Sequence, residues 1–120
     1  GAEAANYPRK KAARSTVFMD EHVLWVQRGG RLLLRQETGR RRQGLWRLPE
    51  RSELDVSNPP LPRLLQIQYA ITHHRVTLSV YDAPDTKPRG GEEWQPEDRL
   101  ADLPMPGPFR RVVDSILQKR

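Results

Sequence analysis

Gly44-Leu45-Trp46-Arg47-Leu48-Pro49-Glu50 is the stretch of sequence that decides the fold. Its tryptophan stands between two leucines, a pattern more typical of a packed core segment than of a surface for base stacking. Glu50 can cap a helix or anchor a loop, but a lone acid cannot build a magnesium site. Residues 58–63, Asn-Pro-Pro-Leu-Pro-Arg, offer no carboxylate to complete one, and their three prolines exclude a continuous helix.

A glycine, five residues and a glutamate also resemble the beginning of a Nudix box. In a Nudix hydrolase, seven further residues lead to Arg-Glu-hydrophobic-x-Glu-Glu, a helix whose carboxylates hold magnesium on a diphosphate. Residues 58–63 occupy that place here, so the resemblance implies the Nudix scaffold without its chemistry. We therefore expect an α+β fold with a Nudix-like (MutT-like) mixed β-sheet and packed helices, in which the helix of the Nudix box is degenerate.

The remaining pattern of apolar and turn residues predicts several strands and one clear helix. Arg28-Gly29-Gly30 indicates the turn of a hairpin, and Trp25 and Trp94 are expected in the core. Apolar and polar side chains alternate over residues 71–81 as in a half-buried strand, and Pro108 opens a helix with an apolar stripe. The other expected elements are strands at 16–19, 22–27 and 31–36, a short helix at 63–68 and a mobile loop at 82–92.

Composition limits the class of protein. The 120 residues suit one domain, which we assign to 15–120, after a basic connector or flexible arm at 1–14. The formal net charge is +6 and the pI about 10.3, so nucleic acid is the natural partner. The absence of cysteine excludes disulfides, thiolate zinc sites and an iron–sulfur cluster within this chain. Without a membrane span, a signal peptide or an initiating Met, we expect an intracellular, excised domain.

Five segments, taken in order, resemble the C-terminal domain of the MutY family of adenine DNA glycosylases. Together they cover about residues 7–117, and their order and spacing are more specific than any one of them. They are Tyr7-Pro8-Arg9-Lys10-Lys11, the Arg-Gly-Gly hairpin with Leu32-Leu33-Leu34, Gly44 to Glu50, Ile71-Thr72-His73, and Trp94 followed by Leu103-Pro104-Met105-Pro106 and a closing helix.

The resemblance implies a non-catalytic task in base excision repair. In this family the domain helps to detect 8-oxoguanine opposite a mispaired adenine, while a separate helical domain with a 4Fe-4S cluster removes the adenine. That domain has no counterpart in these residues, so no catalytic residue, metal or cofactor is expected in them. The implied partners are duplex DNA with 8-oxoguanine:adenine mispairs, the enzyme's own N-terminal catalytic domain, and repair or replication proteins. The implied location is the bacterial cytoplasm, at the nucleoid.

The segment Ile71-Thr72-His73 matches the family's Phe-Ser-His, whose serine hydrogen-bonds the lesion base. Oxidation turns the N7 of guanine from an acceptor into a donor and adds a carbonyl at C8. Thr72 keeps a hydroxyl that can both donate and accept, so the role can transfer to it. His73 is implied near a phosphate or a base edge, whereas Ile71 removes the family's aromatic surface. Without the resemblance, the segment would be an ordinary polar start of a strand.

Basic residues form a second group of candidates. Contacts to phosphates hold a protein on DNA without reading its sequence, which suits a search for lesions. Arg75 and the 40–42 loop are the stronger candidates, and a solvated run of charge is the alternative for each cluster. The candidates are Arg9, Lys10 and Lys11 in the connector, Arg40, Arg41 and Arg42 in the loop before the Gly44–Glu50 motif, and Arg75 beside the recognition segment.

Two other functions stay open at the level of sequence. An active, divergent Nudix hydrolase would need metal ligands at unexpected positions such as Glu53 and Asp55, beside the prolines that break the helix. An interaction module would use the scaffold to bind another repair or replication protein, without a lesion contact. A zinc site is not expected, because the adjacent His73 and His74 would point to opposite faces of a strand.

Overall fold

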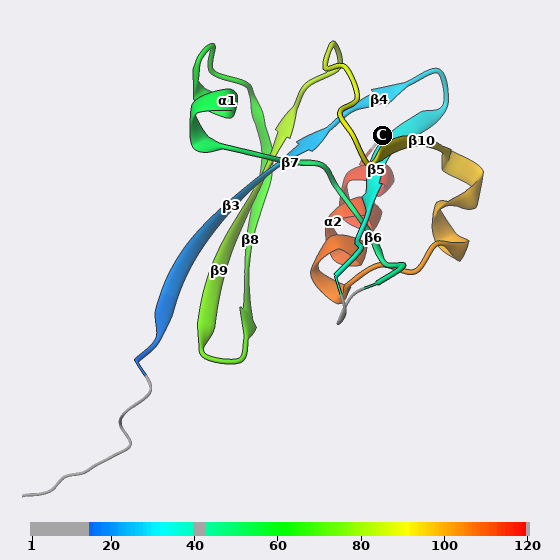
Figure 1. The fold of residues 1–120 in the computed structure, drawn as a ribbon. Coiled ribbons are helices and arrows are strands. Elements are labelled where there is room, and N and C mark those ends of the chain that lie inside the picture. Colours follow the sequence, from blue (N-terminus) through cyan, green and yellow to red (C-terminus); the bar gives the residue numbers. More distant parts are fainter. Residues whose placement is uncertain (1–14, 40–42, 120) are drawn as a thin grey trace, which may run out of the picture.

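The computed structural model describes residues 15–39 and 43–119, which form two small β-sheets and a long C-terminal helix (Figure 1). Both sheets and the helix contribute to one hydrophobic core. In chain order the elements are β3 (Val17–Trp25), β4 (Gln27–Arg28), β5 (Arg31–Gln36), β6 (Trp46–Arg47), β7 (Glu50–Arg51), α1 (Glu53–Ser57), β8 (Arg63–Ile71), β9 (His74–Asp82), β10 (Glu92–Pro96), the 3-10 helix η1 (Glu97–Asp102) and α2 (Gly107–Gln118).

The first sheet has the strand order β7-β3-β9-β8 and is mixed. β8 and β9 form an antiparallel hairpin, and β3 runs parallel to β9 from Val17 opposite His74 to Trp25 opposite Asp82. The segments expected as separate strands at 16–19 and 22–27 are therefore mostly one continuous strand, because β9 pairs with it along its whole length. The parallel pairing also brings the beginning of β3 to the same end of the sheet as the turn of the β8–β9 hairpin (Figure 1).

The second sheet has the order β10-β5-β4, with β6 pairing to β5 near its end. The expected hairpin is confirmed: β4 and β5 pair antiparallel around Gly29 and Gly30, which both have positive φ. A turn that needs two such residues favours glycine, which adopts this backbone without a steric penalty. The sheet carries Leu32 and Leu34 into the shared core, while Leu33 faces a second, smaller cluster.

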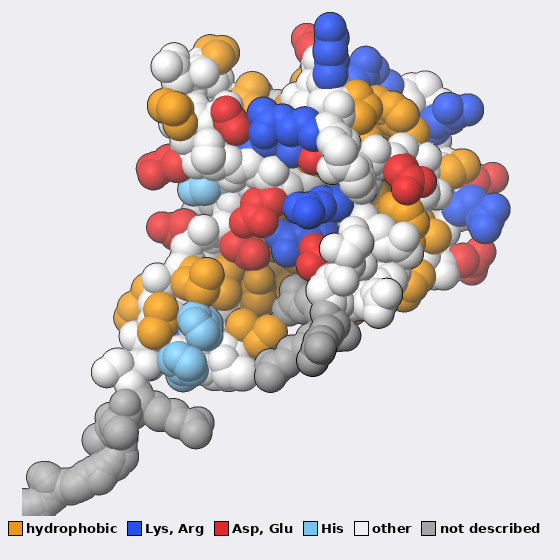
Figure 2. Space-filling view, in the orientation of Figure 1, with side chains coloured by type: hydrophobic (Ala, Val, Ile, Leu, Met, Phe, Trp, Pro, Cys, Tyr) orange, Lys and Arg blue, Asp and Glu red, His pale blue; other side chains and the backbone are white. Residues whose placement is uncertain are grey.

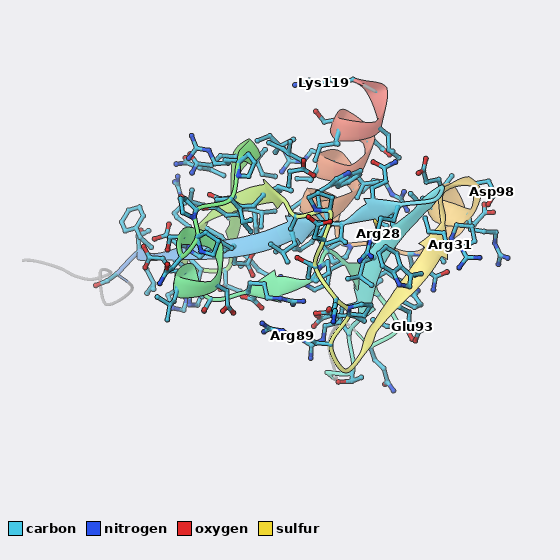
Figure 3. All side chains as sticks on the ribbon, turned by 90° about the horizontal axis from the view of Figure 1, so that it is seen from above. Arg28, Arg31, Arg89, Glu93, Asp98 and Lys119 are labelled. Carbon is cyan, nitrogen blue, oxygen red and sulfur yellow. The ribbon has the colours of Figure 1, made fainter. Side chains whose placement is uncertain are left out.

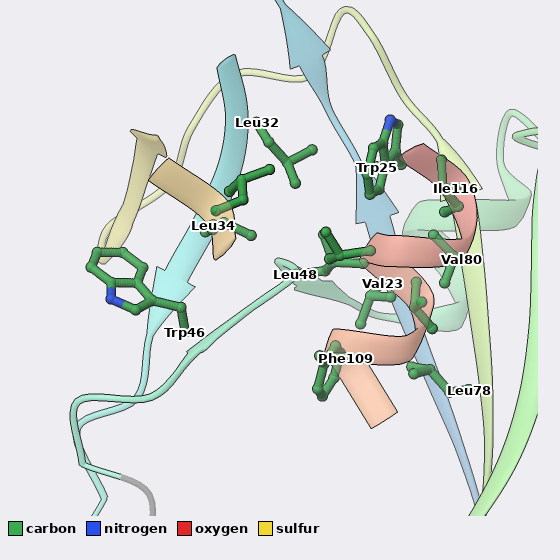
Figure 4. Packing of buried hydrophobic residues seen from close by; sticks show 13 residues of the cluster. Val23, Trp25, Leu32, Leu34, Trp46, Leu48, Leu78, Val80, Phe109 and Ile116 are labelled. Atoms are coloured by element: carbon green, nitrogen blue, oxygen red, sulfur yellow. The ribbon is translucent and has the colours of Figure 1, made fainter. Parts of the chain in front are cut away.

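The C-terminal helix closes the core (Figure 4). As expected from its apolar stripe, α2 buries Phe109, Val112, Val113 and Ile116, and a proline lies in its first turn. These side chains pack with Leu48 of the Gly44–Glu50 motif and with residues from both sheets. Neither α2 nor any other helix in the described part of the chain is long and apolar enough to cross a membrane.

The expected short helix at 63–68 is wrong, because this segment begins strand β8. Along β8 the half-buried Leu65, Ile67 and Tyr69 alternate with the exposed Gln66 and Gln68, which is the period of a strand. The apolar side chains pack against the core, and the strand satisfies its backbone groups by pairing with β9. Tertiary pairing thus overrides the helix propensity of leucine and glutamine.

The helix of the Nudix box is degenerate, as the prolines predict. α1 has five residues, begins at the N-cap Ser52, whose hydroxyl accepts from the backbone N–H of Asp55, and ends before Asn58. Residues 58–62 continue without helix or strand apart from an isolated bridge at Pro60. No helix therefore spans the place where the family's magnesium ligands would stand.

The connection between β9 and β10 is close to the expected loop at 82–92. Residues 83–91 contain no helix or strand, and their backbone turns twice. The backbone N–H of Thr86 donates to the carbonyl of Ala83, and that of Glu92 donates to the carbonyl of Arg89. The mobility of this segment stays a prediction.

Candidate nucleic-acid interface

The expected recognition segment lies at the turn of the β8–β9 hairpin. Ile71 is the last residue of β8, Thr72 and His73 form the turn, and His74 begins β9. The interpretation of Thr72-His73 as the start of a strand is therefore wrong by two residues, because the chain reverses here before pairing resumes between Ile71 and His74. A turn exposes its side chains to a ligand more fully than a strand does.

Thr72 adopts a strained backbone at this turn. Its φ is +52°, in the left-handed region that a β-branched residue rarely adopts. The Thr72 hydroxyl donates to the carbonyl oxygen of Ile71 at 2.6 Å and lies 3.3 Å from Nδ1 of His74. Strain of this kind costs roughly 1–3 kcal/mol and is concentrated at functional sites, which makes the turn a candidate site.

The two histidines are close together. The centroids of the His73 and His74 rings lie 4.3 Å apart with the planes tilted by 38°. The expectation that these side chains point to opposite faces is wrong, because His73 belongs to the turn and the alternation of a strand does not apply to it. Among the described residues no group of three or more histidines and acids could hold a metal ion.

The beginning of β3 completes this end of the sheet. The backbone N–H of Val17 donates to the carbonyl of His73 at 2.9 Å, which ties the strand to the turn. Four large apolar side chains are exposed here: Val17 by 40%, Phe18 by 80%, Met19 by 44% and Ile71 by 41%. Figure 2 shows orange and pale-blue side chains gathered at this end of the sheet. We name residues 15–19 and 70–76 the sheet tip.

The sheet tip contains one arginine and no carboxylate. Arg75 is exposed on β9, and neither 15–19 nor 70–76 contains an Asp or Glu. The exposed Asp20 follows the first segment on β3, opposite Thr77, on the same face of the sheet as Arg75. Within the two segments the tip presents one cation, which suits a phosphate backbone. The other predicted backbone contacts, namely Arg9, Lys10, Lys11, Arg40, Arg41 and Arg42, lie outside the described residues.

The Gly44–Glu50 motif has the expected structural role and holds a buried arginine that the sequence analysis did not single out. Arg47 is buried, and its guanidinium lies 3.4 Å from Glu21, 3.7 Å from Glu37 and 3.9 Å from Glu50. It also stacks over the ring of Phe109 at 4.5 Å from the centroid. Arg47 thus links β3, the β5–β6 connection and α2, and Glu50 contributes to this network rather than to a metal site.

A second buried arginine follows directly after this motif. Arg51 forms a bidentate pair with Glu92, with nitrogen–oxygen distances of 2.6 Å and 2.9 Å, and both side chains are almost fully buried. Burial acts to raise the pKa of the Glu92 carboxyl. Hydrogen bonds from the Arg51 side chain and the Arg89 backbone, together with the charges of both arginines, outweigh it and hold the pKa below its usual value.

Trp94 is less buried than expected. Its ring packs against the smaller core cluster but stays half-exposed, and Arg28 lies over it at 4.8 Å from the centroid. Arg28, Gly29, Arg31 and Trp94 line an open pocket of about 330 Å³. Arg28 and Arg31 lie on the second sheet, far from the sheet tip (Figure 3), and Arg28 is engaged by the carbonyl of Thr86 at 2.5 Å.

The acids considered for a divergent hydrolase do not form a site. Glu53 and Asp55 are exposed in the first turn of α1, and Asp55 pairs with Arg89 at 3.5 Å. Among the described residues, neither belongs to a group of three or more histidines and acids that could hold a metal ion.

No protein-family model and no curated protein matches the sequence, whereas solved structures match the fold. The Nudix domain of Shewanella oneidensis NrtR, complexed with ADP ribose, aligns with a TM-score of 0.63 and 15% identity, over 95% of this chain and 94% of that chain. The E. coli ORF135 protein aligns with a TM-score of 0.60 and 15% identity, over 87% and 94%. A MutT Nudix hydrolase from Burkholderia pseudomallei gives 0.56 and 16%, over 81% and 96%.

These likenesses establish the architecture of the chain. It has an α+β Nudix-like fold, with a mixed sheet and packed helices, as the Gly44–Glu50 motif predicted. At such low sequence identity the likeness concerns the fold alone, so the function has to be argued from the residues of the sheet tip.

Proposed function

We propose that this chain is the non-catalytic lesion-recognition domain of an A/G-specific adenine DNA glycosylase of the MutY family. In this role it helps to detect 8-oxoguanine opposite a mispaired adenine during base excision repair. The observation that carries the proposal is the Thr72 hydroxyl, held at an exposed and strained turn beside Arg75. The resemblance of five segments to that family suggests the identity of the ligand.

The orientation of the Thr72 hydroxyl favours the oxidised base. Because its hydrogen is donated to the carbonyl of Ile71, the oxygen can accept a hydrogen bond through a lone pair. The N7 of 8-oxoguanine carries a hydrogen and can donate to that lone pair. The N7 of guanine is an acceptor, so the hydroxyl would have to turn its hydrogen away from the Ile71 carbonyl to bond with it. The hydroxyl therefore favours the oxidised base.

The proposal assigns no hydrolysis to the chain. Adenine removal would belong to the enzyme's N-terminal catalytic domain, which in this family carries the 4Fe-4S cluster, and the chain itself would need no metal or cofactor. Its partners would be that domain and duplex DNA with 8-oxoguanine:adenine mispairs, in the bacterial cytoplasm at the nucleoid. A partner among repair or replication proteins is compatible with this role.

A DNA-bound relative in fold gives limited support. NrtR from Shewanella oneidensis, solved in complex with a 27mer DNA, aligns with a TM-score of 0.54 and 14% identity, over 79% of this chain and 57% of that chain. It shows a Nudix fold within a DNA-bound protein. Its identity to this chain is too low to transfer contact residues, so the DNA contacts proposed here rest on the sheet tip.

Equilibrium binding of the chain to labelled duplexes tests the proposal. The duplexes carry 8-oxoguanine:adenine or guanine:adenine at one position, and fluorescence anisotropy at low salt gives the ratio of their Kd values. Thr72→Ala should reduce the preference for the oxidised base about fivefold, since one hydrogen bond is worth about 1 kcal/mol. Thr72→Ser should retain the preference, and Thr86→Ala, which alters a threonine far from the sheet tip, should leave it unchanged.

Two outcomes would refute this function. If the chain binds both duplexes equally, or neither, then it does not read the lesion, and the interaction-module alternative gains. If it releases phosphate or pyrophosphate from nucleotides in the presence of magnesium, then it is a hydrolase despite the broken helix.

A further inference from the structure

Phe18 is the most exposed large apolar side chain of the described residues, at 80%. It lies at the second position of β3, one residue from the backbone bond that joins Val17 to the turn. Large apolar side chains gathered at a surface mark interaction sites, so the place of Phe18 at the sheet tip favours a ligand that covers it.

The register of the sheet determines what surrounds Phe18. Phe18 is directly opposite Arg75, and Arg75 is directly opposite Ala70. Residues in register share a face of a sheet, so the aromatic ring and the guanidinium emerge side by side. Val23, which is buried in the core with α2, belongs to the other face, because its position in β3 differs from that of Phe18 by an odd number.

The sheet tip is apolar on both faces. Val17 and Met19 alternate with Phe18 along β3 and lie on the face that continues into the core, in register with His74 and Val76. Ile71 joins them on that face through its pairing with His74. The sheet thus ends in a thin edge, with an aromatic ring and a cation on one side and aliphatic side chains on the other.

The chemistry of Phe18 and Arg75 selects the occupant. Arg75 is the one arginine or lysine of the two tip segments, and Asp20, the first acid on β3, lies on the same face. Nucleic acid offers phosphates to the guanidinium and stacked bases to the ring, so it suits both side chains.

We propose that Phe18 acts as a wedge that inserts between stacked base pairs beside the oxidised guanine. The inference rests on the proposed function, because Thr72 at the turn sets the position of the tip on the DNA. Apolar side chains that enter a base step unstack it and kink the duplex, and the energy lost in stacking is offset by contacts with the protein. Arg75 would hold the adjacent phosphate while Phe18 opens the step.

The test uses the same chain and a duplex with 2-aminopurine next to 8-oxoguanine, because the fluorescence of 2-aminopurine rises when it is unstacked. Saturating wild-type chain should raise this fluorescence. Phe18→Ala should abolish most of the rise and weaken binding roughly tenfold, within the range of base–aromatic stacking. Phe18→Trp should retain both. Leu54→Ala removes another exposed apolar side chain, 69% exposed on α1, and should change neither.

The outcomes separate this inference from the proposed function. If the preference for 8-oxoguanine exists but the fluorescence is flat, or is the same for Phe18→Ala, then the wedge is refuted and the lesion contact stands. If the preference is missing, then both are refuted. If sedimentation finds a wild-type dimer at micromolar concentration that Phe18→Ala dissociates, then the tip is covered by a second copy and the wedge is wrong. Far-UV circular dichroism checks that the variants are folded.

Discussion

The sheet tip and the Gly44–Arg51 segment use arginine in opposite ways. In the Gly44–Arg51 segment, Arg47 and Arg51 are buried and neutralised by glutamates. At the tip, Arg75 is exposed, and the tip segments 15–19 and 70–76 contain no acid. The difference shows that the number of basic residues does not describe the surface, because some of them are held in ion pairs inside the fold.

The segment that resembles the beginning of a Nudix box has a structural role. It is packed in the core, and its Arg47 and Glu50 belong to an ion-pair network. The place of the second half of such a box is occupied by a proline-rich connection that leads into β8. The segment therefore stabilises the scaffold, while the candidate site lies at the far end of the first sheet.

The largest expected effect comes from breaking the buried pair. Arg51→Ala leaves Glu92 buried without its bidentate partner, so the free energy of unfolding should fall by about 3–5 kcal/mol. Urea denaturation measures this change. The double variant Arg51→Met/Glu92→Met replaces both charges by apolar groups and should recover most of the stability. A loss below 1 kcal/mol for Arg51→Ala would show that this pair does not hold the segment.

The same pair predicts a dependence on pH. The pKa of Glu92 is lower in the folded state than in the unfolded state. The contribution of its carboxylate to the free energy of unfolding is therefore complete above the unfolded pKa, and it is lost as the pH falls through the folded pKa. The double variant Arg51→Met/Glu92→Met should therefore lose less stability than the wild type as the pH falls. Thermal unfolding between pH 3 and pH 7, in steps of about half a unit, measures it. Identical acid profiles for the two proteins would contradict the assignment.

A smaller effect of opposite sign is expected at the turn. Thr72→Gly relieves the positive φ and should raise the free energy of unfolding by roughly 0.5–1 kcal/mol, although it removes the hydroxyl. Thr72→Ala keeps a Cβ at that φ and should not stabilise. If Thr72→Gly is more stable but has lost the preference for 8-oxoguanine, then Thr72 lowers the stability of the fold and is kept for recognition. A destabilised variant would show that the turn needs threonine for folding.

The smallest effect on stability is expected at Arg75. Arg75→Gln should change the free energy of unfolding by less than about 0.5 kcal/mol. It should weaken binding to all duplexes alike and reduce the slope of log K against log salt by about one. Arg99→Gln removes an exposed arginine of η1 and serves as the control. A loss confined to damaged DNA would mean that Arg75 reads the base rather than the backbone.

Local patterns predicted much of the fold. The glycine turn at 29–30, the strand that ends near Tyr81 and the apolar stripe of α2 are all present, because each depends on the period or turn chemistry of its own segment. The prediction for 63–68 failed because leucine and glutamine have good helix propensity, and only pairing with β9 makes the segment a strand.

The candidate site was predicted in part. Ile71, Thr72 and His73 were singled out by resemblance and lie together at one turn, although their roles in lesion recognition stay predictions. Phe18 was missed because it is about fifty residues away in sequence and reaches the turn through the parallel pairing of β3 with β9. Arg47 and Arg51 were missed because a sequence shows charge but not burial.

By itself the sequence predicted the Nudix-like scaffold, through the resemblance of Gly44–Glu50 to the beginning of a Nudix box. Its prolines at 59, 60 and 62 predicted the lack of a magnesium helix. Only the tertiary structure decided which basic residues are buried in ion pairs and which side chains lie near Thr72 at the sheet tip. The physical reason is that burial and strand register depend on contacts between distant segments, which no local pattern encodes.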